Sequence, residues 1–143
     1  MDPNSLVKEQ IDAGEALIRK AQVGGLGLAG GACTQVSGDG HPYLYLIAPE
    51  VENRGVGGAY RTIGLAEKEL AEEGGGGSRH IEWFTVKVIP PSDPLAQGIL
   101  RVLSQYPDDR PTRHLGSVLG SVYVEGAYIY PATLFAQQPT AAS

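Results

Sequence analysis

The stretch IEWFTVKVIPPSDPL, residues 81–95, joins a strand pattern directly to a helix start. Residues 80–89 are rich in aromatic and β-branched side chains, which favour strands. Ser92 or Asp93 can accept hydrogen bonds from free N–H groups at a helix start, and Pro94 suits the first turn. The residues that follow repeat at helical spacing, at Leu95, Ile99, Val102 and Leu103. A strand followed at once by a helix is therefore expected here.

The flanking sequence extends this alternation in both directions. On the N-terminal side we expect a helix that starts at Asn4 or Ser5, strands at 26–36 and 42–48 joined by a turn at 37–40, and a helix at about 53–72. On the C-terminal side the pattern predicts a hairpin of residues 117–124 and 127–130, turning at Glu125-Gly126. The order is α-β-β-α-β-α-β-β. It indicates one α+β domain with a single five-stranded, mainly antiparallel sheet and three helices packed on one face.

A glycine-rich segment, GGGGS at 74–78, lies between the second helix and the strand of residues 80–89. The part before it would offer only a two-stranded sheet, which is marginal in water. We therefore interpret the segment as a loop within one domain of residues 1–131, of natural or engineered origin. Residues 132–143 are expected to form a flexible tail.

Composition excludes several classes of function. A formal charge of −5 and no basic run disfavour nucleic acid as a partner. Because there is one cysteine, Cys33, no internal disulfide can form. The N-terminus lacks a signal-peptide pattern and no apolar run reaches the roughly 18 residues of a membrane span. We therefore expect a cytoplasmic protein without membrane contact.

Two motifs suggest ligand binding but stand in the wrong context. Residues 25–30 match G-x-G-x-x-G, yet these glycines follow a helix and lead into a strand, whereas a dinucleotide site needs the reverse. His41, His80, His114 and Cys33 are the soft metal ligands, and none shows a metal-binding spacing. We expect no cofactor and no metal.

The aromatic residues are the group that says most about function. If the aliphatic residues of each strand face the helices, the opposite face carries an aromatic set consisting of Tyr43, Tyr45, Trp83, Tyr123, Tyr128 and Tyr130. Tyrosine and tryptophan combine an apolar body with a polar tip, which suits a protein interface. The alternative is an ordinary solvated sheet surface. The interface hypothesis predicts a non-enzymatic binding or assembly module that pairs with a protein partner or with itself.

A small enzyme is the rival hypothesis. Its site would use carboxylates near Glu50 and Glu52, beside the Ser92-Asp93 helix start. Negative charge at a helix entrance also has a purely structural explanation, so we assign no catalytic residue.

Four segments, EQIDAG, APEV…AYRTI, PPSDPL and VYVEGAYIY, together resemble a family of small uncharacterised bacterial α+β proteins with a C-terminal tyrosine-rich hairpin. The resemblance covers about residues 5–130. It implies the fold and carries over no activity, because the matching motifs are caps, turns and strands.

Overall fold

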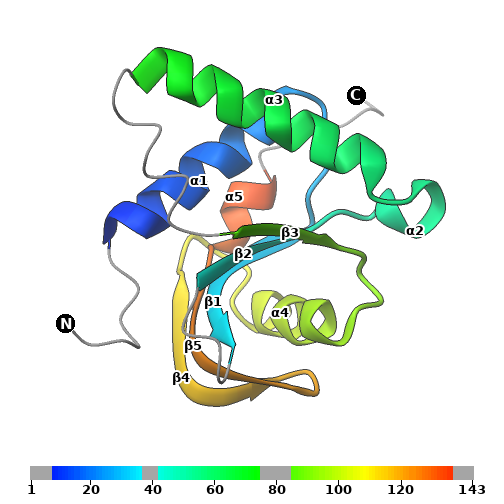
Figure 1. The fold of residues 1–143 in the computed structure, drawn as a ribbon. Helices are drawn as coiled ribbons and strands as arrows, with labels where there is room; N and C mark the ends of the chain where they lie inside the picture. The colour runs from blue at the N-terminus through cyan, green and yellow to red at the C-terminus, as the bar shows by residue number, and fades with distance from the viewer. Residues whose placement is uncertain (1–7, 37–41, 75–84, 137–143) are drawn as a thin grey trace.

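The computed structural model describes residues 8–36, 42–74 and 85–136, which share one five-stranded sheet (Figure 1). The helices are α1 (Lys8–Val23), α2 (Val51–Arg54), α3 (Gly57–Gly74), α4 (Pro94–Gln105) and α5 (Ala132–Ala136). The strands are β1 (Gly30–Val36), β2 (Pro42–Ile47), β3 (Thr85–Ile89), β4 (Thr112–Leu119) and β5 (Val122–Ile129).

The strand order across the sheet is β3-β2-β1-β5-β4. Strand β1 pairs antiparallel with β2 and β5, and β4 pairs antiparallel with β5. Only β2 and β3 are parallel, since α2 and α3 return the chain to the same end of the sheet. The predicted α+β domain with a five-stranded, mainly antiparallel sheet is confirmed, and the predicted element order gains two short helices.

The helices cover both faces of the sheet, so the prediction that they pack on one face was wrong. Helices α1, α3 and α5 lie on one face and α4 on the other (Figure 1). The reason lies in the strands, which carry apolar side chains on both faces. In β2, Leu44 and Leu46 join the core under α1 and α3, whereas Ile47 joins the core over α4. Two apolar faces require two helical layers.

Glycine divides the helix predicted at 53–72. Gly55 has a φ of 76°, a left-handed conformation that ends α2 at Arg54, and α3 begins at Gly57. The glycines that weaken the helical pattern at this point therefore mark a real break.

Helix α4 begins as the sequence predicts and then approaches the sheet very closely. The Asp93 carboxylate accepts a hydrogen bond from Leu95 N at 2.8 Å and caps the helix. At Gly98, an added Cβ would lie 2.2 Å from the backbone nitrogen of Gly120, in the β4–β5 turn. Only glycine permits this backbone contact.

The position of the C-terminal hairpin turn differs from the prediction. The chain turns at Gly120, whose φ is 64°, and Glu125-Gly126 lies inside β5, where the register with β1 shifts. The tail prediction was wrong for residues 132–136, because α5 places Leu134 and Phe135 in the core under α1. Residues 137–143, the 37–40 turn and the loop residues 75–78 lie outside the described residues.

Candidate functional site

The aromatic set predicted for one face is divided between two faces. Tyr45 packs against the α4 core and Tyr128 against the α1 core. Tyr43 lies beside Tyr45, with ring centroids 6.0 Å apart, and the Lys87 ammonium lies 5.0 Å from its ring. Trp83 lies outside the described residues. Because strands bury both faces, alternation did not separate an inner face from an outer one, and the prediction of a single aromatic face was wrong.

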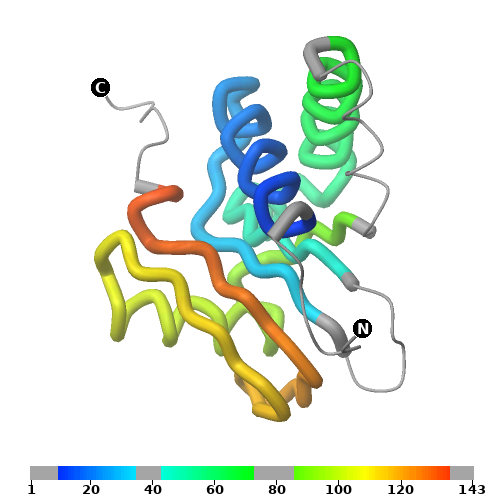
Figure 2. Tube along the Cα trace, turned by 90° about the vertical axis from the view of Figure 1, so that its left-hand side faces the viewer, coloured from blue at the N-terminus to red at the C-terminus, as the bar shows by residue number. Residues whose placement is uncertain are grey.

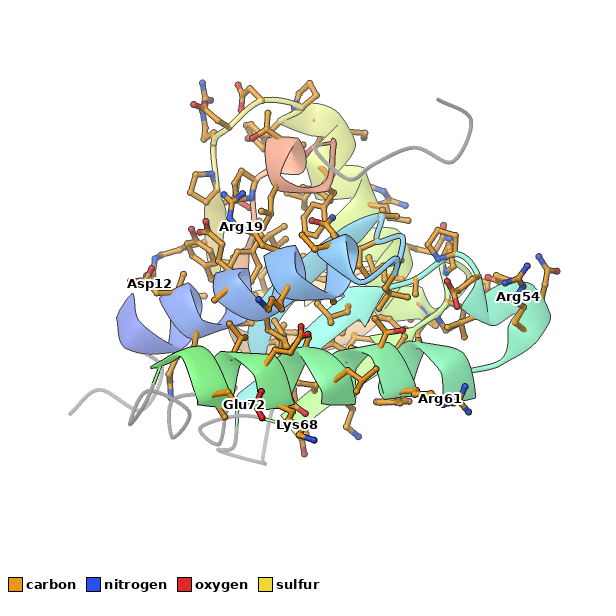
Figure 3. All side chains as sticks on the ribbon, turned by 90° about the horizontal axis from the view of Figure 1, so that it is seen from above. Asp12, Arg19, Arg54, Arg61, Lys68 and Glu72 are labelled. Carbon is orange, nitrogen blue, oxygen red and sulfur yellow. The ribbon has the colours of Figure 1, made fainter. Side chains whose placement is uncertain are left out.

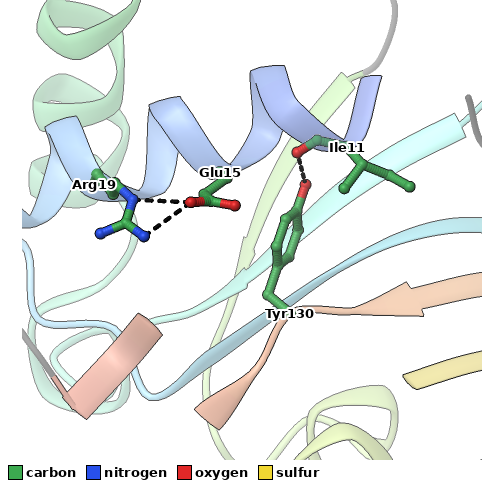
Figure 4. Close-up of polar contacts among 4 residues, drawn as sticks. All are labelled: Ile11, Glu15, Arg19 and Tyr130. Atoms are coloured by element: carbon green, nitrogen blue, oxygen red, sulfur yellow. Dashed lines mark hydrogen bonds and ion pairs between the residues drawn. The ribbon is translucent and has the colours of Figure 1, made fainter. Parts of the chain in front are cut away.

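Tyr130 is completely buried and cannot belong to an interface. Its hydroxyl donates a hydrogen bond to Ile11 O at 2.7 Å, on α1 (Figure 4). The Cys33 Sγ atom lies 3.1 Å from the same hydroxyl. Since the hydroxyl proton goes to Ile11 O, the Cys33 thiol donates to Tyr130 Oη. The side chain therefore fastens α1 to the sheet.

Burial also sets the protonation state of this pair. It raises the pKa of the Cys33 thiol to about 11, against a smaller lowering by the Tyr130 hydrogen bond. Burial likewise raises the pKa of Tyr130. Both groups are neutral at physiological pH, so Cys33 is a buried donor and not a nucleophile.

A shallow cavity of about 250 Å³ lies along α1, lined by Asp12, Glu15, Ala16 and Arg19. Arg19 and Glu15 form an ion pair at 2.8 Å within this lining (Figure 4). Figure 3 shows Asp12 and Arg19 directed away from α3, whose own charged residues Arg61, Lys68 and Glu72 line its outer side.

Tyr128 lies close to this cavity. Partial burial raises the pKa of its phenol, the nearby Glu15 carboxylate adds to the rise, and Arg113 opposes it. The Arg113 guanidinium lies 5.3 Å from the Tyr128 ring centroid, from the neighbouring strand β4. The Glu15 carboxylate is thus paired with Arg19 inside the protein, and the Arg113 guanidinium contacts the neutral Tyr128 ring.

The most exposed apolar group of the sheet lies on the outer hairpin. Leu115, Val118 and Tyr123 are 71%, 59% and 47% exposed, and we name these three residues the hairpin patch. Val118 and Tyr123 are cross-strand neighbours. Tyr123 Oη lies 3.5 Å from the place of a Cβ on Gly116, the residue next to Leu115. Tyr123 thus lies beside Val118 and reaches towards the residue next to Leu115. The far end of the hairpin extends beyond α1 (Figure 2).

Sequence reasoning found one of these three residues. Tyr123 belongs to the predicted aromatic set, while Leu115 and Val118 were missed. The usable signal is the run Leu115–Leu119, which has no charged side chain and stands at the edge of the sheet.

Two of the three carboxylates of the enzyme hypothesis accept hydrogen bonds from backbone N–H groups. Glu52 accepts a hydrogen bond from Ser92 N at 2.9 Å, and Asp93 caps α4. Glu50 lies near Gly58, at the start of α3. His114 stands on β4, at the sheet edge opposite β3, and contacts Thr112 at 3.1 Å. Burial lowers the pKa of His114.

The remaining residues singled out from the sequence are placed as follows. Gly30 and Gly31 belong to β1, and Leu26 and Leu28 are core residues, so the glycine motif is a connection between α1 and the sheet. His41 and His80 lie outside the described residues. Among residues 8–36, 42–74 and 85–136 no helix combines the length and the hydropathy needed to cross a bilayer.

Comparisons of the chain with protein-family models, with curated proteins and with solved structures give no match.

Proposed function

We propose that this protein is a non-enzymatic binding or assembly module that acts through the hairpin patch. The observation that carries the proposal is the exposure of Leu115, Val118 and Tyr123, three large apolar side chains of one hairpin, two of which are cross-strand neighbours. Single exposed apolar residues are common, whereas adjoining ones mark interaction sites. Tyrosine adds a hydroxyl that keeps a hydrogen-bond partner at the rim of an interface.

The energy available is of the right order for specific association. At about 25 cal/mol per Å², a few hundred Å² of apolar surface contributes several kcal/mol before the cost of association is deducted. Arg113 and Tyr128 border the patch on the side of α1 and supply polar groups for orientation. An apolar centre with a polar border is the usual anatomy of a protein interface.

The binding module is favoured over the enzyme because the carboxylates nearest to a candidate catalytic site make structural contacts. A catalytic acid or base needs a substrate-facing position in a concave pocket. Glu52 and Asp93 instead hold backbone N–H groups, and Glu15 is paired with Arg19 in a shallow cavity. We retain the cytoplasmic location and the bacterial family as parts of the proposal, supported by the lone Cys33 and by the resemblance.

Affinity capture tests this function. The wild type, Leu115→Arg and Leu65→Arg would each be immobilised and exposed to lysate of the producing cells, with bound proteins quantified by mass spectrometry. Leu65 is the matched control, because it is 59% exposed on α3, away from the hairpin. We expect Leu115→Arg to lose proteins that both other baits retain. Equal capture by all three baits would contradict the proposal.

A further inference from the structure

Strand β3 forms one edge of the sheet, and two of its residues direct their backbone groups away from β2. In a parallel pair, the N–H and C=O groups of one residue point to the same side, and successive residues alternate. Ile89 points towards β2, because its C=O group accepts a hydrogen bond from Ala48 N at 3.1 Å. The N–H and C=O groups of Val86 and Val88 therefore point outward, where an added strand would bind them.

The hydroxyl of Tyr60, in the first turn of α3, occupies one of these outward groups. Val88 N donates a hydrogen bond to Tyr60 Oη at 2.9 Å. Because this N–H group points outward, the hydroxyl lies beyond β3, in the position that a C=O group of an added strand would take. The Tyr60 side chain is 40% exposed, so it covers the edge from the solvent side.

Lys87 obstructs the same edge from the other face of the sheet. Its ammonium lies 5.0 Å from the Tyr43 ring, and Lys87 pairs with Tyr45, which packs against the α4 core. Tyr60 comes from α3, which covers the opposite face. A central lysine and a short strand, here of five residues, are common means of preventing edge-to-edge association. A strand that approached β3 would therefore meet one side chain on each face.

We propose that Tyr60 is a guard that closes the β3 edge to strand pairing. Its hydroxyl holds the outward N–H group of Val88, so the side chain must leave this position before β3 can pair with another strand. The inference does not depend on the hairpin patch, which belongs to the opposite edge of the sheet. It confines association to surfaces of the protein other than β3.

Amide hydrogen exchange followed by NMR tests the hydrogen bond. Tyr60→Phe keeps the ring and removes the acceptor, and Tyr106→Phe is the matched control, because Tyr106 is similarly exposed, at 38%. We expect the Val88 N–H group to exchange at least about tenfold faster in Tyr60→Phe alone, while the amides of Lys87 and Ile89, which point towards β2, keep their rates. An unchanged Val88 rate overturns the inference, as does an equal rise at all three amides, which marks general destabilisation.

Sedimentation velocity over a concentration series tests the closure of the edge. Because the lysine is a second obstacle, the variants all carry Lys87→Thr. We expect Lys87→Thr with Tyr60→Ala to form larger species at concentrations at least about tenfold lower than Lys87→Thr with Tyr106→Ala. Equal association of these two double variants, both shown to be folded by circular dichroism, overturns the proposal. If the Tyr60→Ala chain does not fold, the exchange experiment with Tyr60→Phe decides.

Discussion

Gly14 on α1 and Tyr130 after β5 form a pair whose energetic coupling can be measured. A Cβ added at Gly14 would lie 2.1 Å from Tyr130 Oη, far inside van der Waals contact. The same hydroxyl is held in place by Ile11 O at 2.7 Å. Neither α1 nor the Tyr130 side chain can move away without losing the hydrogen bond that fastens α1 to the sheet. We therefore predict that Gly14→Ala destabilises the wild type and is harmless once the hydroxyl is absent.

The magnitudes follow from two opposing terms. In a helix interior, Gly→Ala normally stabilises by about 0.5–1 kcal/mol, whereas overpacking a core costs about 1–3 kcal/mol. Gly14→Ala should therefore lower the free energy of unfolding by roughly 1–2 kcal/mol. Tyr130→Phe alone should cost about 1–2 kcal/mol, because the Cys33 thiol loses its acceptor. In the Tyr130→Phe background, the nearest atoms to the new Cβ are Cζ of residue 130 at 3.2 Å and Leu44 Cδ1 at 3.4 Å.

A double-mutant cycle by urea unfolding, followed by circular dichroism at 222 nm, measures the coupling. We expect Gly14→Ala to become neutral or stabilising in the Tyr130→Phe background, which corresponds to a coupling of about 1–2 kcal/mol. If Gly14→Ala costs the same in both backgrounds, to within about 0.5 kcal/mol, the hydroxyl is not the reason for glycine and the reasoning fails.

Further predictions concern α4, α3 and Cys33. Gly98→Ala should lower the free energy of unfolding by about 2–3 kcal/mol, although alanine has the better helix propensity, because the new Cβ meets the Gly120 backbone. Gly64→Ala has open space around it and should raise the free energy of unfolding by up to about 1 kcal/mol. Urea unfolding measures both values. Asp93→Ala should cost about 1 kcal/mol by losing the cap, and Asp93→Asn much less. Since burial raises the pKa of Cys33 from 9.0 to about 11, its contribution to stability is complete below pH 9 and is lost as the pH rises towards 11. The unfolding free energy of wild type should therefore fall more steeply over that range than that of Cys33→Ala, and equal slopes would contradict the assignment.

Local signals predicted much of the fold. The cap at Asp93, the start of α4 and the alternation of helices and strands depend on neighbouring residues, and the structure contains all of them. The side of the sheet that each helix covers depends on distant residues. Strand β2 is apolar at Leu46 and at Ile47, so its pattern alone gave no inner face. The hairpin turn was misplaced because Glu125-Gly126 has turn composition, whereas close packing against Gly98 fixes the turn at Gly120.

The candidate site was less predictable for the same reason. Tyr130 and Tyr123 look alike in sequence, yet one is buried under α1 and the other stands 47% exposed on the outer hairpin. What separates them is whether a helix covers their part of the sheet. Leu115 and Val118 would be assigned to a core by composition, and only the strand order places β4 at an edge. Exposure is a tertiary property that strand periodicity does not contain.

Amide hydrogen exchange along β4 tests the central claim, that this strand and the hairpin patch form the interface, most directly. Amides of Thr112–Leu119 that point away from β5 are predicted to exchange rapidly in the free protein and to become protected when a protein captured by the wild type is bound, while those of β3 do not change. Protection at β4 that is the same with and without the bound protein would contradict the account, because an interface formed there must shield this strand from solvent.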